Sequence, residues 1–259
     1  FAVLLPGASR GYADEVADRV RYALTERAPA SIGIAVFPID GAAPEELHRC
    51  ADTELYERKG DRVARAMGPV ERKELSWATT LANAVDTRMA VQHEHSTNVG
   101  EYAAAIGRQL GWGQEEVGLL RVAGILHDVG KVVVPDRILR KAGPLTAEEF
   151  EAIKPFPGAG AELVGRIEGM DPILPWIRHS HERMDGKGYP DGLAGEAIPL
   201  GARILHVADA YDSMISKRTY REPMSLHHAL SELRAGTGTQ FDPDCVAALE
   251  EYLASAHAA

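Results

Sequence analysis

The sequence predicts a mainly α-helical protein that begins with a short α/β segment. Beyond about residue 92, apolar residues recur every three or four positions, which is the spacing of one face of a helix. Before residue 66, short apolar runs instead alternate with a helical stretch, as in an α/β unit. We therefore expect an α/β segment over 1–66, a linker helix over 67–92 and a helical domain over 93–259.

The α/β segment contains two candidate strands and two candidate helices. The runs "FAVLLP" at 1–6 and "SIGIAVFP" at 31–38 are short and apolar, which is typical of strands. Residues 10–27 between them have the composition of a helix. Asp40-Gly41 predicts a turn, and Pro44 suits the first turn of a second helix.

The linker segment 67–92 carries apolar residues at heptad-like spacing, namely Leu75, Ala78, Ala82, Val85 and Met89. Such a stripe is compatible with pairing between two copies of the chain, which would make a homodimer. It is equally compatible with packing of the helix on its own domain. The spacing alone leaves both interpretations open.

Three apolar stripes predict long helices in the 93–259 domain. They are Val99, Tyr102, Ala103, Ile106 and Leu110; Val117, Leu120 and Gly124; and Ile204, Ala208, Tyr211 and Ile215. Between the second and third stripes, prolines and glycines are frequent, so short helices and loops are expected there.

Composition excludes several classes of partner. The chain has 259 residues and a formal net charge of −10, so a nucleic-acid polymer or an anionic membrane is not an expected partner. Its two cysteines, Cys50 and Cys245, lie far apart and suggest no disulfide framework, which fits the cytoplasm. No apolar run approaches the roughly 18 residues of a membrane span. Because the chain begins at Phe1 and not at Met, we expect it to be part of a longer protein.

The adjacent pair His127-Asp128 is the sharpest chemical signal. Adjacent helical residues point about 100° apart, so both can hold one metal only where the helix ends or bends, and Gly130 permits that. His95 is a candidate partner, as is Asp209, which lies off the apolar stripe of its own helix. Three or four His and Asp ligands with an open position suit a divalent metal that activates water.

The motifs "HDVGK", "HSHERMDGKGYP" and "VADAYDSMISKRTYR", in this order, resemble the HD-GYP branch of the HD metal-dependent phosphohydrolases. The resemblance runs from about residue 76 to 253. It implies an HD-type α-helical bundle that holds iron or manganese. Members of this branch hydrolyse the bacterial second messenger cyclic di-GMP, so cyclic di-GMP or a related guanine nucleotide is the implied substrate.

The resemblance assigns the first metal site to His95, His127, Asp128 and Asp209, all of which have ligating side chains. It also implies a catalytic role for Asp128 and for Lys131. The Lys131 ammonium would stabilise phosphoryl charge or a leaving oxygen.

Three further residues are implied to bind substrate. Arg218 and Arg221, spaced i and i+3, match basic residues that hold phosphates, a task suited to a guanidinium group, although a solvated helix end explains them too. Tyr189 of the Gly-Tyr-Pro loop could stack on the nucleotide or could simply pack beside the site.

The second metal site of the family departs from the pattern in this chain. Phe156 and Ser180 stand where the family has histidines, which leaves Asp128 as a bridging ligand together with His181. Two protein ligands are too few for a tight site, so one well-formed metal site is expected and a second is doubtful. His179 is a candidate substitute, one residue out of register.

A third metal is not expected, because Val91 stands where three-metal members have a glutamate. His93 is interpreted as an exposed residue at a helix start. Asp212, three residues after Asp209, is interpreted as a group that supports a ligand or caps the helix.

Residues 1–66 resemble the second half of a GGDEF diguanylate cyclase domain, through "FAVLLPGAS", "SIGIAVFPIDG" and "ADTELYERKGDR". Phe1 would end the signature motif, so the metal-binding acids that make cyclic di-GMP lie outside this chain. No synthesis of cyclic di-GMP is expected.

These observations together predict a phosphodiesterase of bacterial cyclic di-GMP signalling with a reduced metal centre and weakened activity. The alternative is an inactive module that senses the nucleotide or binds a protein partner. A third interpretation, hydrolysis of a mononucleotide, is disfavoured by the Gly-Tyr-Pro loop.

Overall fold

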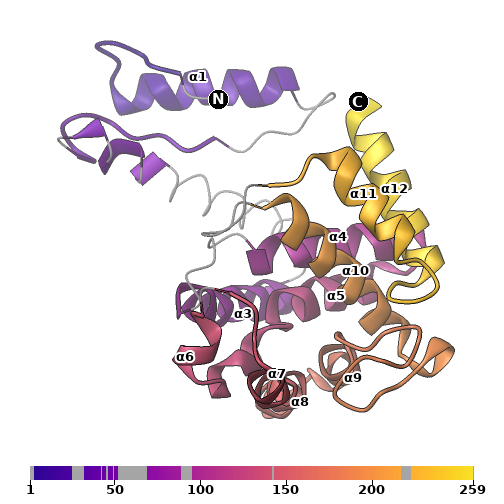
Figure 1. Cartoon of the computed structure of the whole chain (residues 1–259). Coiled ribbons are helices and arrows are strands. Elements are labelled where there is room, and N and C mark those ends of the chain that lie inside the picture. Colours follow the sequence, from indigo (N-terminus) through magenta and orange to yellow (C-terminus); the bar gives the residue numbers. More distant parts are fainter. Residues whose placement is uncertain are drawn as a thin grey trace. The chain divides into compact units, whose positions relative to one another are not determined.

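The computed structural model describes residues 3–24, 32–41, 43–44, 46–48, 50–51, 69–88, 95–141, 143–216 and 223–258. The chain divides into two compact units, Phe1–Arg72 and Lys73–Ala258 (Figure 1). Within the described residues, none of the helices combines the length and the hydropathy that crossing a bilayer requires.

The N-terminal unit contains the predicted first helix, α1 (Arg10–Leu24). The two strands expected at 1–6 and 31–38 are wrong, because residues 3–6 and 32–38 form no strand. Asp40 explains this for the second run. Its Oδ2 accepts a hydrogen bond from the Val36 amide at 2.7 Å, and its own amide donates to the Val36 carbonyl at 2.8 Å. These bonds close a turn and occupy the backbone groups that a neighbouring strand would need.

The second unit is helical. Its longer helices are α3 (Pro69–Arg88), α4 (His95–Gln109), α5 (Gln114–Leu126), α10 (Leu200–Ile215), α11 (Leu226–Ala235) and α12 (Pro243–Ala258). Shorter elements connect them: η1 (Val129–Val133), α6 (Asp136–Leu139), α7 (Ala147–Ile153), α8 (Phe156–Val164), η2 (Asp171–Ile173), α9 (Leu174–Arg178) and η3 (Gly195–Ala197). Helices α4, α5 and α10 occur where the three apolar stripes predicted them, and the short connecting elements lie in the stretch rich in proline and glycine between α5 and α10.

Helices α4 and α5 lie against each other through glycines. A Cβ atom added to Gly124 would lie 2.6 Å from the Gly100 Cα, so the two backbones touch there. Gly107, further along α4, contacts Leu120, which is earlier in α5. The helices therefore run antiparallel, and the start of α4 lies beside the end of α5. This arrangement brings His95 and His127 to the same end of the helix pair.

Helix α10 packs across α4 with its predicted apolar stripe. Ile204 and Ala208 are fully buried, and the Tyr211 ring meets the Tyr102 ring of α4 edge to face at 4.9 Å. Asp209 lies off this stripe, as predicted, and faces the end of the pair where His95 lies. Packing of α10 therefore supplies the site with a carboxylate from a third helix.

The 3-10 helix η1 rests on the first turns of α8. A Cβ atom added to Gly130 would lie 1.8 Å from the Phe156 carbonyl oxygen and 2.5 Å from the Gly160 nitrogen. Phe156 is 1% exposed and forms a small core cluster with Val134 and Ile138. The segment after His127-Asp128 is thus held tightly over Phe156.

Replacing Gly130 by alanine tests this contact. The added methyl group would meet backbone atoms that cannot turn aside, so we expect the free energy of unfolding to fall by about 3 kcal/mol. Thermal unfolding should show a melting temperature lower by about 10 °C. Gly113→Ala is the control, because its Cβ would have a single neighbour at 3.6 Å and a cost below about 1 kcal/mol is expected. Equal melting temperatures for the two variants would contradict the close approach of η1 and α8.

Candidate metal centre

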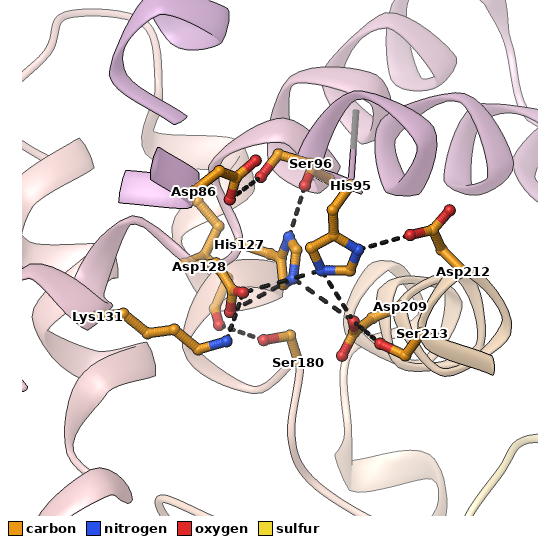
Figure 2. Close-up of polar contacts among 12 residues, drawn as sticks. Asp86, His95, Ser96, His127, Asp128, Lys131, Ser180, Asp209, Asp212 and Ser213 are labelled. Carbon is orange, nitrogen blue, oxygen red and sulfur yellow. Dashed lines mark hydrogen bonds and ion pairs between the residues drawn. The ribbon is translucent and has the colours of Figure 1, made fainter. Parts of the chain in front are cut away.

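Four side chains from three helical segments converge at one end of the α4–α5 pair (Figure 2). His95 Nε2 lies 3.4 Å from Asp209 Oδ1 and 4.0 Å from Asp128 Oδ2. His127 Nε2 lies 3.4 Å from Asp128 Oδ1 and 3.8 Å from Asp209 Oδ1. Two atoms that each lie about 2.1 Å from one ion, at tetrahedral or octahedral angles, are about 3.0–3.4 Å apart. The two shorter distances lie at the upper end of this range and the two longer ones lie 0.4–0.6 Å beyond it, so the four side chains would converge on one ion after a small movement.

The end of α5 allows two adjacent residues to face one site. The helix ends at Leu126, His127 keeps helical backbone angles, and Asp128 turns to φ −96° and ψ 0° before η1 begins. The pair therefore lies at a helix end, which is the position that two adjacent ligands of one ion would need.

Each histidine is oriented by a hydrogen bond on the far side of its ring. His95 Nδ1 lies 2.6 Å from Asp212 Oδ2, and His127 Nδ1 lies 2.7 Å from the Gly124 carbonyl oxygen. Both partners are acceptors, so the neutral form of each ring carries its proton on Nδ1 and has its lone pair on Nε2. Histidines that bind metals are oriented in this way. The supporting role predicted for Asp212 agrees with this contact.

Two of the ligand atoms have no hydrogen-bond partner, whereas Asp209 Oδ1 accepts a hydrogen bond from Ser213 at 3.1 Å. In the part of the chain that the structure describes, His127 Nε2 and Asp128 Oδ1 are buried without a hydrogen bond. The donor atoms of His95, His127 and Asp128 all lie within 4.8 Å of one another. Buried polar atoms are rarely left unpaired in a native protein. Imidazole and carboxylate donors of this kind fit a divalent cation.

The electrostatics of the two carboxylates suit a cation. Burial opposes their ionisation, but neighbouring groups outweigh it. His127, Lys131 and His95 hold the pKa of Asp128 well below its usual value. His127 and His95 lower the pKa of Asp209 to about 2. Both side chains are therefore carboxylates at neutral pH.

The second carboxylate oxygen of Asp128, Oδ2, contacts a lysine that is packed on an aromatic ring. Lys131 Nζ lies 2.5 Å from Asp128 Oδ2 and 5.1 Å from the centre of the Phe156 ring. Phe156 offers no ligand atom, and the Ser180 hydroxyl donates to the Ile177 carbonyl oxygen at 2.9 Å. His181 Nε2 is buried without a hydrogen-bond partner, and burial lowers the His181 pKa to about 3. Of the positions that the resemblance relates to a second ion, only His181 and Asp128 carry an imidazole or a carboxylate that would bind it.

His179, the candidate substitute ligand, contacts Glu182 and Asp191. Its Nδ1 lies 3.8 Å from Glu182 Oε1 and 3.6 Å from Asp191 Oδ2. Glu182 Oε1 also accepts hydrogen bonds from the amides of Asp191 and Gly192, at 2.7 and 3.0 Å. These contacts tie the His179 segment to the end of the Gly-Tyr-Pro loop.

Tyr189 lies beside the site with one ring face covered. Its ring stacks on His181 at 5.2 Å with an angle of 3° between the planes, and its edge contacts include Phe150 and Phe156. Burial raises the pKa of the Tyr189 hydroxyl. The Tyr189 ring therefore helps to fix His181. The remaining predicted substrate residues, Arg218 and Arg221, lie outside the described residues, as do Val91 and His93.

Asp86 of α3 is a site neighbour that the sequence reasoning missed. It is fully buried and its Oδ1 accepts a hydrogen bond from Ser96, the residue after His95 (Figure 2). Burial raises the Asp86 pKa. A signal was available, because Ala78, Ala82 and Asp86 are spaced i, i+4 and i+8. A carboxylate on an apolar stripe indicates a buried polar contact.

The chain belongs to the HD domain family, because the model of that family matches residues 79–245. The family is metal-dependent, and the His95, His127 and Asp128 group described above is of the expected kind.

Curated relatives agree with this assignment. The chain is 36% identical over 238 residues to a cyclic di-GMP phosphodiesterase response regulator of Xanthomonas campestris, covering 86% of this chain and 63% of that protein. It is 38% identical over 161 residues to a cyclic di-GMP phosphodiesterase of Thermotoga maritima, covering 60% of this chain and 43% of that protein. The chain thus spans less than two thirds of either relative.

A solved structure shares the fold. The crystal structure of a cyclic GMP-AMP specific phosphodiesterase of Vibrio cholerae aligns with a TM-score of 0.55 and 22% identity, covering 69% of this chain and 48% of that one. At this level of identity the likeness concerns the fold alone. It supports the helical architecture described above.

Replacing Asp212 by asparagine tests the support of His95. The substitution keeps the shape of the side chain but removes the charge that fixes the ring, so we expect Mn²⁺ to bind about tenfold more weakly. Competition with a fluorescent chelator measures this affinity. The exposed Asp244 provides a matched control, and Asp244→Asn should leave the affinity unchanged. Equal affinities for the two variants would mean that Asp212 does not act through a metal ligand.

Proposed function

We propose that this chain is an HD-GYP protein that hydrolyses a phosphodiester bond of cyclic di-GMP or a related cyclic dinucleotide. The observation that carries the proposal is the buried donor set of His95, His127, Asp128 and Asp209, in which two donor atoms lack any other partner. The motif order and the names of the curated relatives support the choice of substrate class.

In this proposal, His95, His127, Asp128 and Asp209 hold one iron or manganese ion. A divalent ion there would supply the Lewis acidity that activates water toward a phosphodiester. The reaction consumes one water molecule, breaks one phosphorus–oxygen bond to a ribose 3′ oxygen and leaves a linear dinucleotide. Lys131, at the edge of the donor set, stabilises the negative charge that develops on the phosphoryl group or the leaving oxygen.

The centre is reduced in comparison with a two-metal site. Phe156 supplies no donor, and the Ser180 hydroxyl is engaged by Ile177. Two-metal sites divide the activation of water and the neutralisation of phosphate charge between two ions. A chain with one ion is therefore expected to turn over more slowly.

Other parts of the proposal concern residues around the centre. Arg218 and Arg221 hold the substrate phosphates, and Tyr189 borders the nucleotide pocket with the part of its ring that His181 leaves open. Residues 1–66 correspond to part of a GGDEF-like domain. The cytoplasm is the proposed location, and pairing of two copies through 67–92 is the proposed route to a homodimer.

Turnover in the presence of Mn²⁺ or Fe²⁺ tests the proposed activity. Purified protein should convert cyclic di-GMP to the linear dinucleotide, measured by liquid chromatography. His127→Ala should lower the rate by about 100-fold or more, because it removes a donor from the buried set. The exposed His228 provides the control, and His228→Ala should keep the rate of the unmodified chain.

An inactive module that senses the nucleotide would bind cyclic di-GMP without hydrolysing it. Micromolar binding of the nucleotide without any product from the unmodified chain, in the presence of either metal, would contradict hydrolysis and favour an inactive sensing module.

A further inference from the structure

Lys131 and Phe156 lie on the Oδ2 side of Asp128. The ammonium group lies 2.5 Å from Asp128 Oδ2 (Figure 2). The same Nζ atom lies 5.1 Å from the centre of the Phe156 ring, at the distance of a cation–π contact. One ammonium is thus held between a buried carboxylate and the face of an aromatic ring.

The ring under the ammonium is fixed. Phe156 is 1% exposed and belongs to the core cluster with Val134 and Ile138. Its edge meets the His181 ring at 5.0 Å, and its carbonyl oxygen lies against Gly130 of η1. Because η1 also carries Lys131, the same close contact sets the position of the ring and of the lysine backbone.

This arrangement disfavours the binding of a second divalent ion to Asp128 Oδ2. Such an ion would have to displace the ammonium from the carboxylate or lie next to a like charge. Among the described residues around this position, His181 offers an imidazole lone pair and Phe156 offers none. The neutral Ser180 hydroxyl, oriented by its hydrogen bond to the Ile177 carbonyl oxygen, is a weaker ligand than the histidine that it replaces.

We propose that the Lys131 ammonium, seated on the Phe156 ring, takes the place of a second divalent ion as the fixed second positive charge of the centre. The inference rests on the proposed function, because it names the group that neutralises phosphate charge in that reaction. The two carboxylates, Asp128 and Asp209, balance the charge of one divalent ion. The four ligands, one divalent ion and Lys131 together then carry one net positive charge, and the Asp212 carboxylate lies on the far side of the His95 ring.

A cycle of variants tests the exchange between ammonium and metal. F156H/S180H adds two donors where the structure now has a ring and an engaged hydroxyl, and K131M removes the ammonium while keeping an apolar stem. K131M is made in both the unmodified chain and F156H/S180H.

The first readout is metal binding, measured by equilibrium dialysis with elemental analysis for Mn²⁺. We expect one ion per unmodified chain and two per F156H/S180H chain. Adding K131M to F156H/S180H should tighten the second ion by about tenfold, because the competing charge is gone. Two ions bound by the unmodified chain, or no tightening of the second ion, would overturn the proposal.

The second readout is kcat/KM on cyclic di-GMP. K131M should cost about 100-fold in the unmodified chain. In F156H/S180H, where a second ion supplies the charge, the cost should fall below about fivefold. An equal cost in both backgrounds would contradict the proposed exchange. If no variant turns over any cyclic dinucleotide, the proposed function fails, and the metal-binding readout still decides the role of Lys131.

Lys154 provides a matched control. Its ammonium lies 5.1 Å from the centre of the Phe150 ring and pairs with Glu151, so it makes the same kind of contact outside the donor set. K154M should change neither the metal count nor kcat/KM. Circular dichroism and thermal unfolding establish that each variant folds. If F156H/S180H does not fold, the same comparison is made with S180H alone, where the same tightening is required.

Discussion

The buried carboxylate of Asp128 is the constraint around which the site is organised. The residue is 3% exposed, and a carboxylate in that position is costly unless both oxygens find positive partners. Oδ1 is buried without a hydrogen bond and lies 3.4 Å from His127 Nε2, while Oδ2 lies 4.0 Å from His95 Nε2. Oδ2 accepts from Lys131. Oδ1 is therefore available to a metal ion, while Oδ2 already contacts the Lys131 ammonium. In a two-metal centre, the same aspartate would instead bridge two ions.

Close backbone contacts between the surrounding helices position the side chains around the Asp128 carboxylate. Gly100 and Gly124 let α4 and α5 touch, which aligns His95 with the residues that follow α5. Gly130 lets η1 lie on α8, which fixes Lys131 over the Phe156 ring. Small residues at helix contacts are thus the reason that side chains distant in sequence meet with little freedom. A change at these glycines would move ligands without touching any of them.

Much of the donor set could be predicted from sequence, but its surroundings could not. His95, His127, Asp128 and Asp209 were identified because motif order and the need for a helix end constrain them, whereas periodicity shows only which face of a helix is apolar. It does not show what lies opposite. The contact between Lys131 and Phe156, the buried position of Asp86 and the covering of Tyr189 by His181 all arise from tertiary packing. The strand expected at 31–38 fails for a local reason, because Asp40 bonds to the backbone of Val36, four residues earlier, and the turn predicted at Asp40-Gly41 begins within the run.

A crystal structure of the Mn²⁺-loaded protein, with anomalous differences measured at the manganese edge, tests the central claim most directly. We predict one manganese peak among His95, His127, Asp128 and Asp209, with Lys131 still bonded to Asp128 Oδ2 above the Phe156 ring. Two peaks bridged by Asp128, with the lysine displaced from the carboxylate, would contradict it.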